Sequence, residues 1–244
     1  MPKKTRLMMK INDKDDNSLD IDIYEDIEPA GWFSEGSAMT LKNVLNDNKG
    51  VKNINVRINS LGGDIFEGIA MYNLLKDNPA NVTVKVDGIA ASSASIIAMA
   101  GDKIIMPSNA MLMIHNCWTY AIGNSAELRK IADDMDKIME SAKNTYLNKC
   151  GEKIKKDELD TLLDEETYLS AQEALDYGFI DEISNEAADE TVVDKIVKDS
   201  TCNLESYYCK KKDIKDKFIK NSGSEGKDIK DKTKDLRELF AKII

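Results

Sequence analysis

Residues 82–101 contain the feature that most restricts how this chain can fold. Valines alternate with polar residues over residues 82–86, which is the period-two pattern of a β-strand. Gly88 interrupts this pattern, and residues 90–100 are all small residues, apolar residues or serines. The segment therefore predicts a strand, a tight turn at Gly88 and a buried helix that ends at Gly101.

Three serines lie where this helix is expected to begin: Ser92, Ser93 and Ser95. The first turn of a helix carries free backbone N–H groups and the positive end of the helix dipole. Both features suit a nucleophile whose reaction produces an oxyanion, so the serines are candidate nucleophiles. The alternative interpretation is that they only pack closely or cap the helix.

A second segment of the same kind precedes this one. Residues 54–58 alternate apolar and polar side chains, run into Gly62 and Gly63, and continue into a helical pattern over residues 65–75. Two consecutive units of strand, glycine turn and helix predict parallel strands joined by crossover helices, which is an α/β fold. The carboxyl ends of adjacent parallel strands share one edge of a sheet, so we expect the Gly-Gly turn beside Ser92. This turn has neither the Walker nor the dinucleotide-binding spacing.

His115 is the only histidine of the chain. It follows residues 111–114, a short apolar strand expected after another strand at residues 103–106. Histidine is the side chain whose ordinary pKa suits general-base catalysis near neutral pH. Any Ser–His chemistry must therefore use His115, although a lone histidine is more often a surface or core residue.

The remaining patterns predict further elements. The longest is an amphipathic helix that opens with a capping box at Asn124 and Glu127 and ends near Gly151. Its apolar stripe, which is expected to contact the core or another subunit, consists of Leu128, Ile131, Met135, Ile138 and Ala142. The other predicted elements are strands at 7–11 and 19–23, a helix capped by Ser37 that runs to residue 45, a helix at 156–163, and a helix between a Ser170–Glu173 capping box and Gly178.

Composition separates the end of the chain from its body. Residues 186–244 hold 14 Lys/Arg and 13 Asp/Glu, so residues 1–185 carry a net charge of −11, against −10 for the whole chain. We expect a compact domain over 1–185, a charged linker over 186–235 and a short amphipathic helix over 236–244, which packs on its own domain or docks onto a partner.

Charge and cysteine usage exclude several classes of protein. The net negative charge argues against a nucleic-acid-binding protein. No apolar run approaches the roughly 20 residues that cross a membrane, and the N-terminus lacks the apolar stretch of a signal peptide. Four scattered cysteines without a CxxC pair, together with one histidine, predict no metal site and no cofactor, and they suit the reducing cytoplasm.

Four blocks of this sequence resemble the ClpP family of serine peptidases and, more narrowly, the ClpP-related head maturation (prohead) proteases of tailed phages and prophages. The blocks are residues 58–66 (INSLGGDIF), 86–92 (VDGIAAS), 106–116 (MPSNAMLMIHN) and 166–174 (ETYLSAQEA). The resemblance covers about residues 18–184. It implies a spiral of parallel β–β–α units, shared with crotonases, from which a handle helix protrudes. The helix that follows Asn124 matches that handle.

The resemblance also implies the roles of individual residues. Ser92 matches the nucleophile and His115 the general base. The backbone N–H groups of Gly63 and Ser93 match the oxyanion donors, and Glu166 matches the third residue of the triad. This agrees with the independent chemical interpretation, in which an imidazole takes the serine proton and two amides bind the tetrahedral oxyanion.

The chain departs from the family at two of these positions. ClpP has aspartate where this chain has Glu166, so the longer side chain changes the reach toward the histidine. Asp164 and Glu165 are therefore alternatives for the third residue. Leu61 replaces the proline that usually precedes the two glycines, which we expect to loosen the turn without removing an N–H donor.

The family resemblance implies an oligomeric enzyme that hydrolyses protein or peptide substrates. Its members form six- or seven-membered rings, often stacked in pairs, whose active sites face an inner chamber. The leading hypothesis is a cytoplasmic serine endopeptidase that trims phage capsid or scaffold proteins in the bacterial host, at the assembling procapsid. The alternatives are a housekeeping Clp subunit that works with a separate AAA+ unfoldase, a relative of the enoyl-CoA hydratases, and an inactive scaffold or adaptor. The chain itself has no Walker motif.

Overall fold

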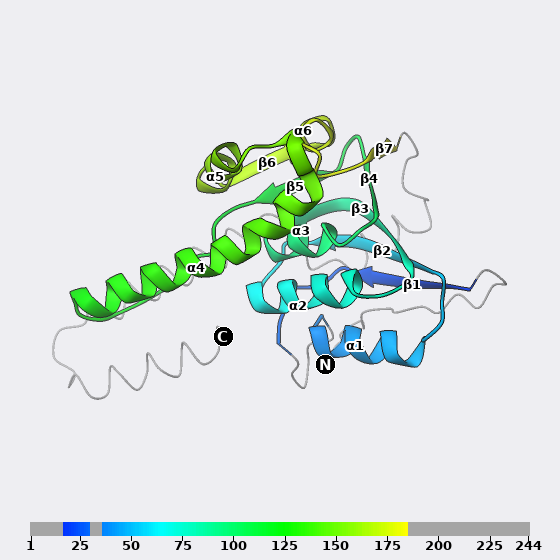
Figure 1. Cartoon of the computed structure of the whole chain (residues 1–244), viewed down its shortest axis with the longest axis horizontal. Coiled ribbons are helices and arrows are strands. Elements are labelled where there is room, and N and C mark those ends of the chain that lie inside the picture. Colours follow the sequence, from blue (N-terminus) through cyan, green and yellow to red (C-terminus); the bar gives the residue numbers. More distant parts are fainter. Residues whose placement is uncertain (1–16, 30–35, 185–244) are drawn as a thin grey trace, which may run out of the picture. The chain divides into compact units, whose positions relative to one another are not determined.

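The computed structural model describes residues 17–29 and 36–184, which form an α/β unit built on one sheet (Figure 1). Its strands are β1 (Ser18–Ile23), β2 (Asn53–Ser60), β3 (Asn81–Ala91), β4 (Lys103–Pro107), β5 (Met111–Ile114), β6 (Thr167–Ser170) and β7 (Glu182–Ser184). Its helices are α1 (Ala38–Asp47), α2 (Ile65–Lys76), α3 (Ser93–Ala98), α4 (Ser125–Cys150), the 3-10 turn η1 (Gly151–Lys153), α5 (Lys156–Asp164) and α6 (Ala171–Tyr177).

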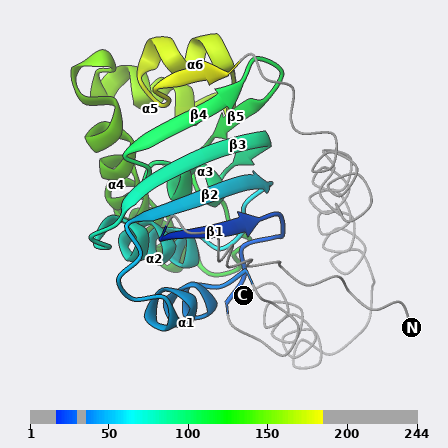
Figure 2. The ribbon, with the colours of Figure 1, turned by 90° about the vertical axis from the view of Figure 1, so that its right-hand side faces the viewer.

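The sheet is parallel along the order β1-β2-β3-β4-β7. β5 also pairs in parallel with β3, and β6 pairs antiparallel with β5. Figure 2 shows α1, α2 and α4 together on one side of the strands. The predicted α/β fold with crossover helices is confirmed.

Alternation of apolar side chains explains which face of the sheet the helices cover. Ile54, Val56 and Ile58 of β2 are buried, and so are the valines of β3 at positions 82, 84 and 86. Burying one such side chain contributes about 1.5–3 kcal/mol, so a slip by one residue would expose the whole set. The predicted period of two therefore sets both the buried face and the register.

β3 does not end at Gly88, where the sequence pattern predicted a turn. The strand continues to Ala91, and Ile89 donates its N–H to Asn59 Oδ1 at 3.3 Å. A Cβ added at Gly88 would lie 2.7 Å from the same Oδ1 atom, and the β2–β3 register shifts between Ile58 and Ser60. The glycine thus marks an irregularity in strand pairing, where a neighbouring side chain comes close to the backbone.

The predicted helix after β3 is correspondingly shorter than expected. α3 begins at Ser93 and ends at Ala98, whereas the pattern indicated residues 90–100. Its residues are all buried, so periodicity carries no information on the boundaries of this segment.

The predicted caps are confirmed at three helices. Ser37 accepts a hydrogen bond from the N–H of Thr40. Both capping boxes are present, at Asn124 before α4 and at Ser170 before α6, and Gly178 ends α6 in the left-handed conformation. Local sequence is sufficient here because each cap bonds within its own helical turn.

α4 is the protruding handle helix, and Figure 1 shows its first half extending away from the sheet. In its second half Met139, Ala142 and Tyr146 are buried against the rest of the fold. In its first half Leu128 is 42% exposed. The predicted apolar stripe therefore contacts the core only along its C-terminal part.

Several predictions lie outside the described residues: the strand at 7–11, the linker at 186–235 and the helix at 236–244. The boundary predicted after residue 185 also lies outside them. Among the described residues, no helix is both long enough and apolar enough to span a membrane.

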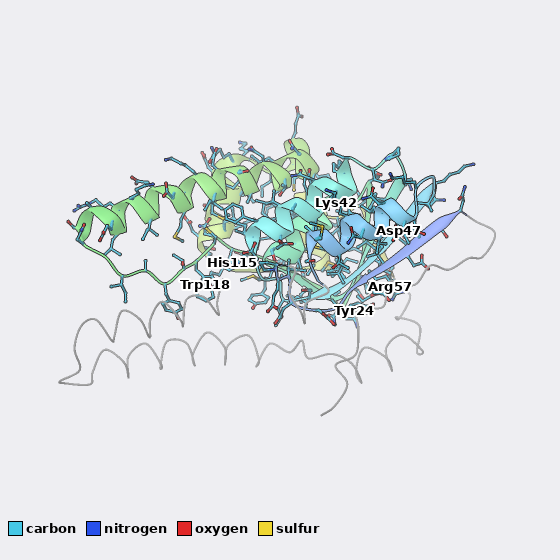
Figure 3. The ribbon with its side chains drawn as sticks, turned by 90° about the horizontal axis from the view of Figure 1, so that it is seen from below. Tyr24, Lys42, Asp47, Arg57, His115 and Trp118 are labelled. Carbon is cyan, nitrogen blue, oxygen red and sulfur yellow. The ribbon has the colours of Figure 1, made fainter. Side chains whose placement is uncertain are left out.

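The sequence patterns did not predict a polar cluster on β2 and β3. The Asp87 side chain is 1% exposed and accepts Arg57 Nε at 2.8 Å and Nη2 at 2.7 Å. The Tyr24 hydroxyl donates to the same carboxylate at 2.5 Å. Burial and the Asp87 carboxylate raise the pKa of Tyr24, so the phenol remains a donor. Figure 3 shows Tyr24 and Arg57 apart from His115, so this cluster lies away from the candidate active site.

Candidate active site

Ser92 occupies the turn between β3 and α3 in a backbone conformation that is rare for residues other than glycine. Its φ is 55° and its ψ is −129°. Its N–H donates to the carbonyl of Met113 on β5 at 3.0 Å. Although Ser92 holds the N-cap position of α3, its side chain makes no capping hydrogen bond. The hydroxyl is therefore available for another partner.

That partner is His115. Its Nε2 lies 2.7 Å from Ser92 Oγ, and the residue is only 7% exposed. The register of β3 and β5 explains the meeting, because Ala91 pairs with Met113 and each strand then continues toward the same edge of the sheet. The structure thus brings together the two residues that sequence reasoning paired across 23 positions. Their catalytic roles remain predictions.

The other two candidate serines have different surroundings. Ser93 is buried, and Ser95 is fully buried. Ser95 Oγ donates to the carbonyl of Ser92 at 2.6 Å and hydrogen bonds with the hydroxyl of Tyr146 at 2.8 Å. Of the three serines, Ser92 combines a partly exposed side chain with the imidazole.

The Gly-Gly turn lies against the nucleophile turn, as predicted. A Cβ added at Gly62, whose φ is +88°, would lie 2.8 Å from Ser92 Cβ and 2.9 Å from Ser93 N. Only glycine permits this approach at a positive φ. The two backbone segments that carry the predicted oxyanion donors are therefore in contact.

The orientation of each donor follows from its backbone pairing. Ile27 bonds with the groups on either side of Gly63, namely the Gly62 carbonyl at 3.0 Å and the Asp64 N–H at 2.8 Å. The N–H of Gly63 itself consequently points away from Ile27. The N–H of Ser93 is the first of α3, and the first N–H groups of a helix have no partner within it.

The three acidic candidates for the third residue of the triad lie at the end of α5 and the start of β6. The β5–β6 ladder ends with Ile114 paired to Thr167, so His115 and Glu166 are the residues adjacent to that last pair, and Glu166 has a φ of 50°. Asp164 instead accepts Asn116 Nδ2 at 2.6 Å. Glu165 is the C-cap of α5. Of the three acids considered from the sequence, Glu166 is the one directly next to the end of this ladder.

The chemistry available at this site is acyl transfer. A serine hydroxyl next to an imidazole, with backbone amides at a helix start, can attack a carbonyl and stabilise the resulting oxyanion. Across residues 17–29 and 36–184, no cluster of three or more His, Cys, Asp or Glu side chains could hold a metal ion. The fold and the site together define a serine hydrolase of the α/β class.

Comparison with known proteins identifies the family. The family model for Clp protease matches residues 33–187, which is more than half of the chain. The chain therefore belongs to the Clp protease family and is a serine-type endopeptidase by class.

Two curated relatives are similar to this chain, and both are ATP-dependent Clp protease proteolytic subunits. The subunit of Oltmannsiellopsis viridis is 31% identical over 143 residues, covering 57% of this chain and 72% of the relative. That of Ligilactobacillus salivarius (strain UCC118) is 35% identical over 135 residues, covering 54% of this chain and 67% of the relative. These relatives support the family, and they do not support the narrower phage type expected from the sequence.

A solved structure shows the same fold. A mutant of ClpP1 from Listeria monocytogenes matches with a TM-score of 0.58 and 23% identity, covering 68% of this chain and 91% of that one. This likeness confirms the predicted ClpP-like architecture.

Replacing Gly62 with alanine tests the contact between the two turns. We expect Gly62→Ala to lower kcat/KM by at least about 100-fold, the loss typical of a displaced oxyanion donor, because its Cβ would displace Ser92 and Ser93. The measurement is cleavage of a short fluorogenic peptide, with the urea midpoint recorded in parallel.

Gly50→Ala is the matched control. Gly50 also has a positive φ of 99°, but an added Cβ would meet no atom within 4 Å. It should therefore cost about 1 kcal/mol of stability and leave turnover unchanged. Equal activity in the two variants would contradict the assigned contact.

Proposed function

We propose that this protein hydrolyses peptide bonds with Ser92 as the nucleophile. The observation that carries the proposal is the 2.7 Å separation of Ser92 Oγ and His115 Nε2. His115 takes the hydroxyl proton as Oγ attacks the carbonyl, and the N–H groups of Gly63 and Ser93 bind the oxyanion. His115 then protonates the leaving amine, and water hydrolyses the acyl-enzyme by the same steps.

The hydrogen bond and the backbone conformation of Ser92 argue against two other functions considered from the sequence. An enoyl-CoA hydratase of this fold would use a backbone oxyanion hole without needing this Ser–His pair. An inactive scaffold would have no reason to hold a serine at φ 55°, a conformation that costs about 1–3 kcal/mol and is found mainly at functional sites.

Labelling with a fluorophosphonate tests the nucleophile. The wild-type chain should be labelled at Ser92, and Ser92→Ala should not be labelled. His115→Ala should lower kcat by at least about 100-fold, because it removes the general base while leaving assembly intact. Labelling that persists in Ser92→Ala would assign the nucleophile to Ser93 or Ser95, and near-normal turnover in His115→Ala would exclude the proposed base.

We also propose that Glu166 orients His115. Glu166→Gln keeps the shape of the side chain and removes its charge, so kcat should fall by roughly 100-fold or more with little change in KM. Asp164→Asn is the control, since Asp164 bonds with Asn116, and it should retain turnover. The opposite pattern would transfer the role to Asp164. Peptide cleavage under saturating substrate measures both variants.

We propose a ring of identical subunits around an inner chamber as the working form. Both relatives are proteolytic subunits, which supports an assembly, and the exposed first half of α4 offers an apolar contact surface. Met135→Glu should reduce the mass measured by light scattering, because a charge would enter that contact. Asp133→Ser, at an exposed position on the same half of α4, should leave the mass unchanged. A wild-type protein that is wholly monomeric would contradict the ring.

Two biological settings fit this chemistry. The relatives' description as ATP-dependent supports a housekeeping role in the bacterial cytoplasm, in which a separate AAA+ unfoldase supplies unfolded protein. The residues of the four sequence blocks favour the second setting, the processing of phage capsid or scaffold proteins at the procapsid. Neighbouring portal and capsid genes, together with cleavage of a scaffold protein in the absence of an ATPase, would distinguish the second from the first.

A further inference from the structure

A buried pair of hydroxyl groups holds the carbonyl of Ser92, and the mechanism above does not use it. Ser95 Oγ donates to Ser92 O at 2.6 Å and lies 2.8 Å from the hydroxyl of Tyr146. Ser95 is 0% exposed and Tyr146 is 1% exposed. Tyr146 belongs to α4, so these bonds connect the buried half of that helix to the nucleophile turn.

Counting protons gives the direction of both bonds. A serine hydroxyl has one proton, and Ser95 uses it toward the Ser92 carbonyl. The proton between the two hydroxyls must therefore come from Tyr146. Burial raises the pKa of Tyr146, so the phenol remains protonated and continues to donate. The relay runs from Tyr146 to Ser95 to the carbonyl of Ser92.

The position of this carbonyl matters because of what shares its peptide plane. The Ser92 carbonyl and the Ser93 N–H belong to one planar trans peptide unit and point in opposite directions. A hydrogen bond that fixes the carbonyl therefore also fixes the direction of the N–H that is assigned to the oxyanion.

Besides this pair, backbone hydrogen bonds support the nucleophile turn, among them that of the Ser92 N–H with the Met113 carbonyl. Ser92 has a strained backbone, and such residues persist only where the surroundings hold them. α3 has only six residues and no side-chain cap. Its first turn supplies two backbone bonds to the Ser92 carbonyl, from Ser95 N at 2.9 Å and from Ile96 N at 3.4 Å. The Ser95 hydroxyl provides the shorter bond to the same atom.

We propose that Tyr146 and Ser95 are positioning residues that aim the Ser93 N–H at the oxyanion. This inference rests on the proposed function, in which Ser92 is the nucleophile. If so, the buried half of α4, the handle helix, helps to support the active site through the Tyr146 hydroxyl.

The test compares Tyr146→Phe, Ser95→Ala and the double variant in the full-length protein. Tyr146→Phe removes one oxygen and keeps the ring, which packs edge-on against Phe179 with ring centroids 5.9 Å apart. We expect kcat for a short peptide to fall roughly 3- to 10-fold in Tyr146→Phe and about 10- to 100-fold in Ser95→Ala, with KM unchanged, since a displaced oxyanion donor acts on the transition state. The double variant should match Ser95→Ala alone, because Tyr146 acts through Ser95.

Tyr177→Phe is the matched control, since Tyr177 also contacts Phe179, with ring centroids 6.3 Å apart. It should leave kcat unchanged. Wild-type kcat in folded Tyr146→Phe and Ser95→Ala would overturn the proposal, and so would additive losses in the double variant. A loss of stability without any change in kcat would show a merely structural role and would also overturn it.

The rate of fluorophosphonate labelling separates this proposal from the one on which it rests. If the wild-type chain is not labelled at Ser92, the proposed function itself fails. If Ser92 is labelled and Ser92→Ala is inactive, but the relay variants react at the wild-type rate, only the positioning role fails. Slower labelling of Ser92 in Tyr146→Phe, with Tyr177→Phe unchanged, supports the relay.

Discussion

The active site depends on one constraint, which is that two strands, β4 and β5, pair with the same edge of β3. β3 has eleven residues, and its first half pairs with β4 while its last three residues pair with β5. Because β5 runs parallel to β3, the side chains at both carboxyl ends meet at one edge of the sheet. The Ser92 N–H bond to the Met113 carbonyl extends this pairing into the nucleophile turn. Without β5, His115 would have no fixed distance from Ser92.

The second pairing of β5 extends the site by one more residue. β6 lies antiparallel on the other edge of β5, and His115 and Glu166 adjoin the last pair of that ladder. The site is thus assembled from three chain segments by two ladders of backbone hydrogen bonds. Side-chain bonds add the finer placement, as the Ser95 hydroxyl shows at the Ser92 carbonyl. Backbone pairing sets which residues meet, and buried hydroxyls set how they point.

Prediction from sequence succeeded where one residue type or one local turn was decisive. His115 could be identified as the partner of Ser92 because the chain has no other histidine. The capping boxes at Asn124 and Ser170 were readable because their partners lie three residues away. The role of Gly88 was misinterpreted because the side chain that requires a glycine there belongs to Asn59. Asn59 lies 29 positions earlier, on a neighbouring strand. The Arg57–Asp87–Tyr24 cluster and the Ser95–Tyr146 pair were missed for the same reason, since each joins residues distant in the chain.

The sequence by itself determined the α/β class, the order of the elements up to α4, the buried face of β2 and β3, and that any Ser–His pair must use His115. These follow from periodicity, capping chemistry and residue scarcity, all of which are local or compositional properties. Only the tertiary structure decided that β3 continues through Gly88, that Ser92 has a positive φ, and that Asp164 bonds with Asn116. The physical reason is that strand register and close packing are set by the fit of distant segments, which no single stretch of the chain encodes.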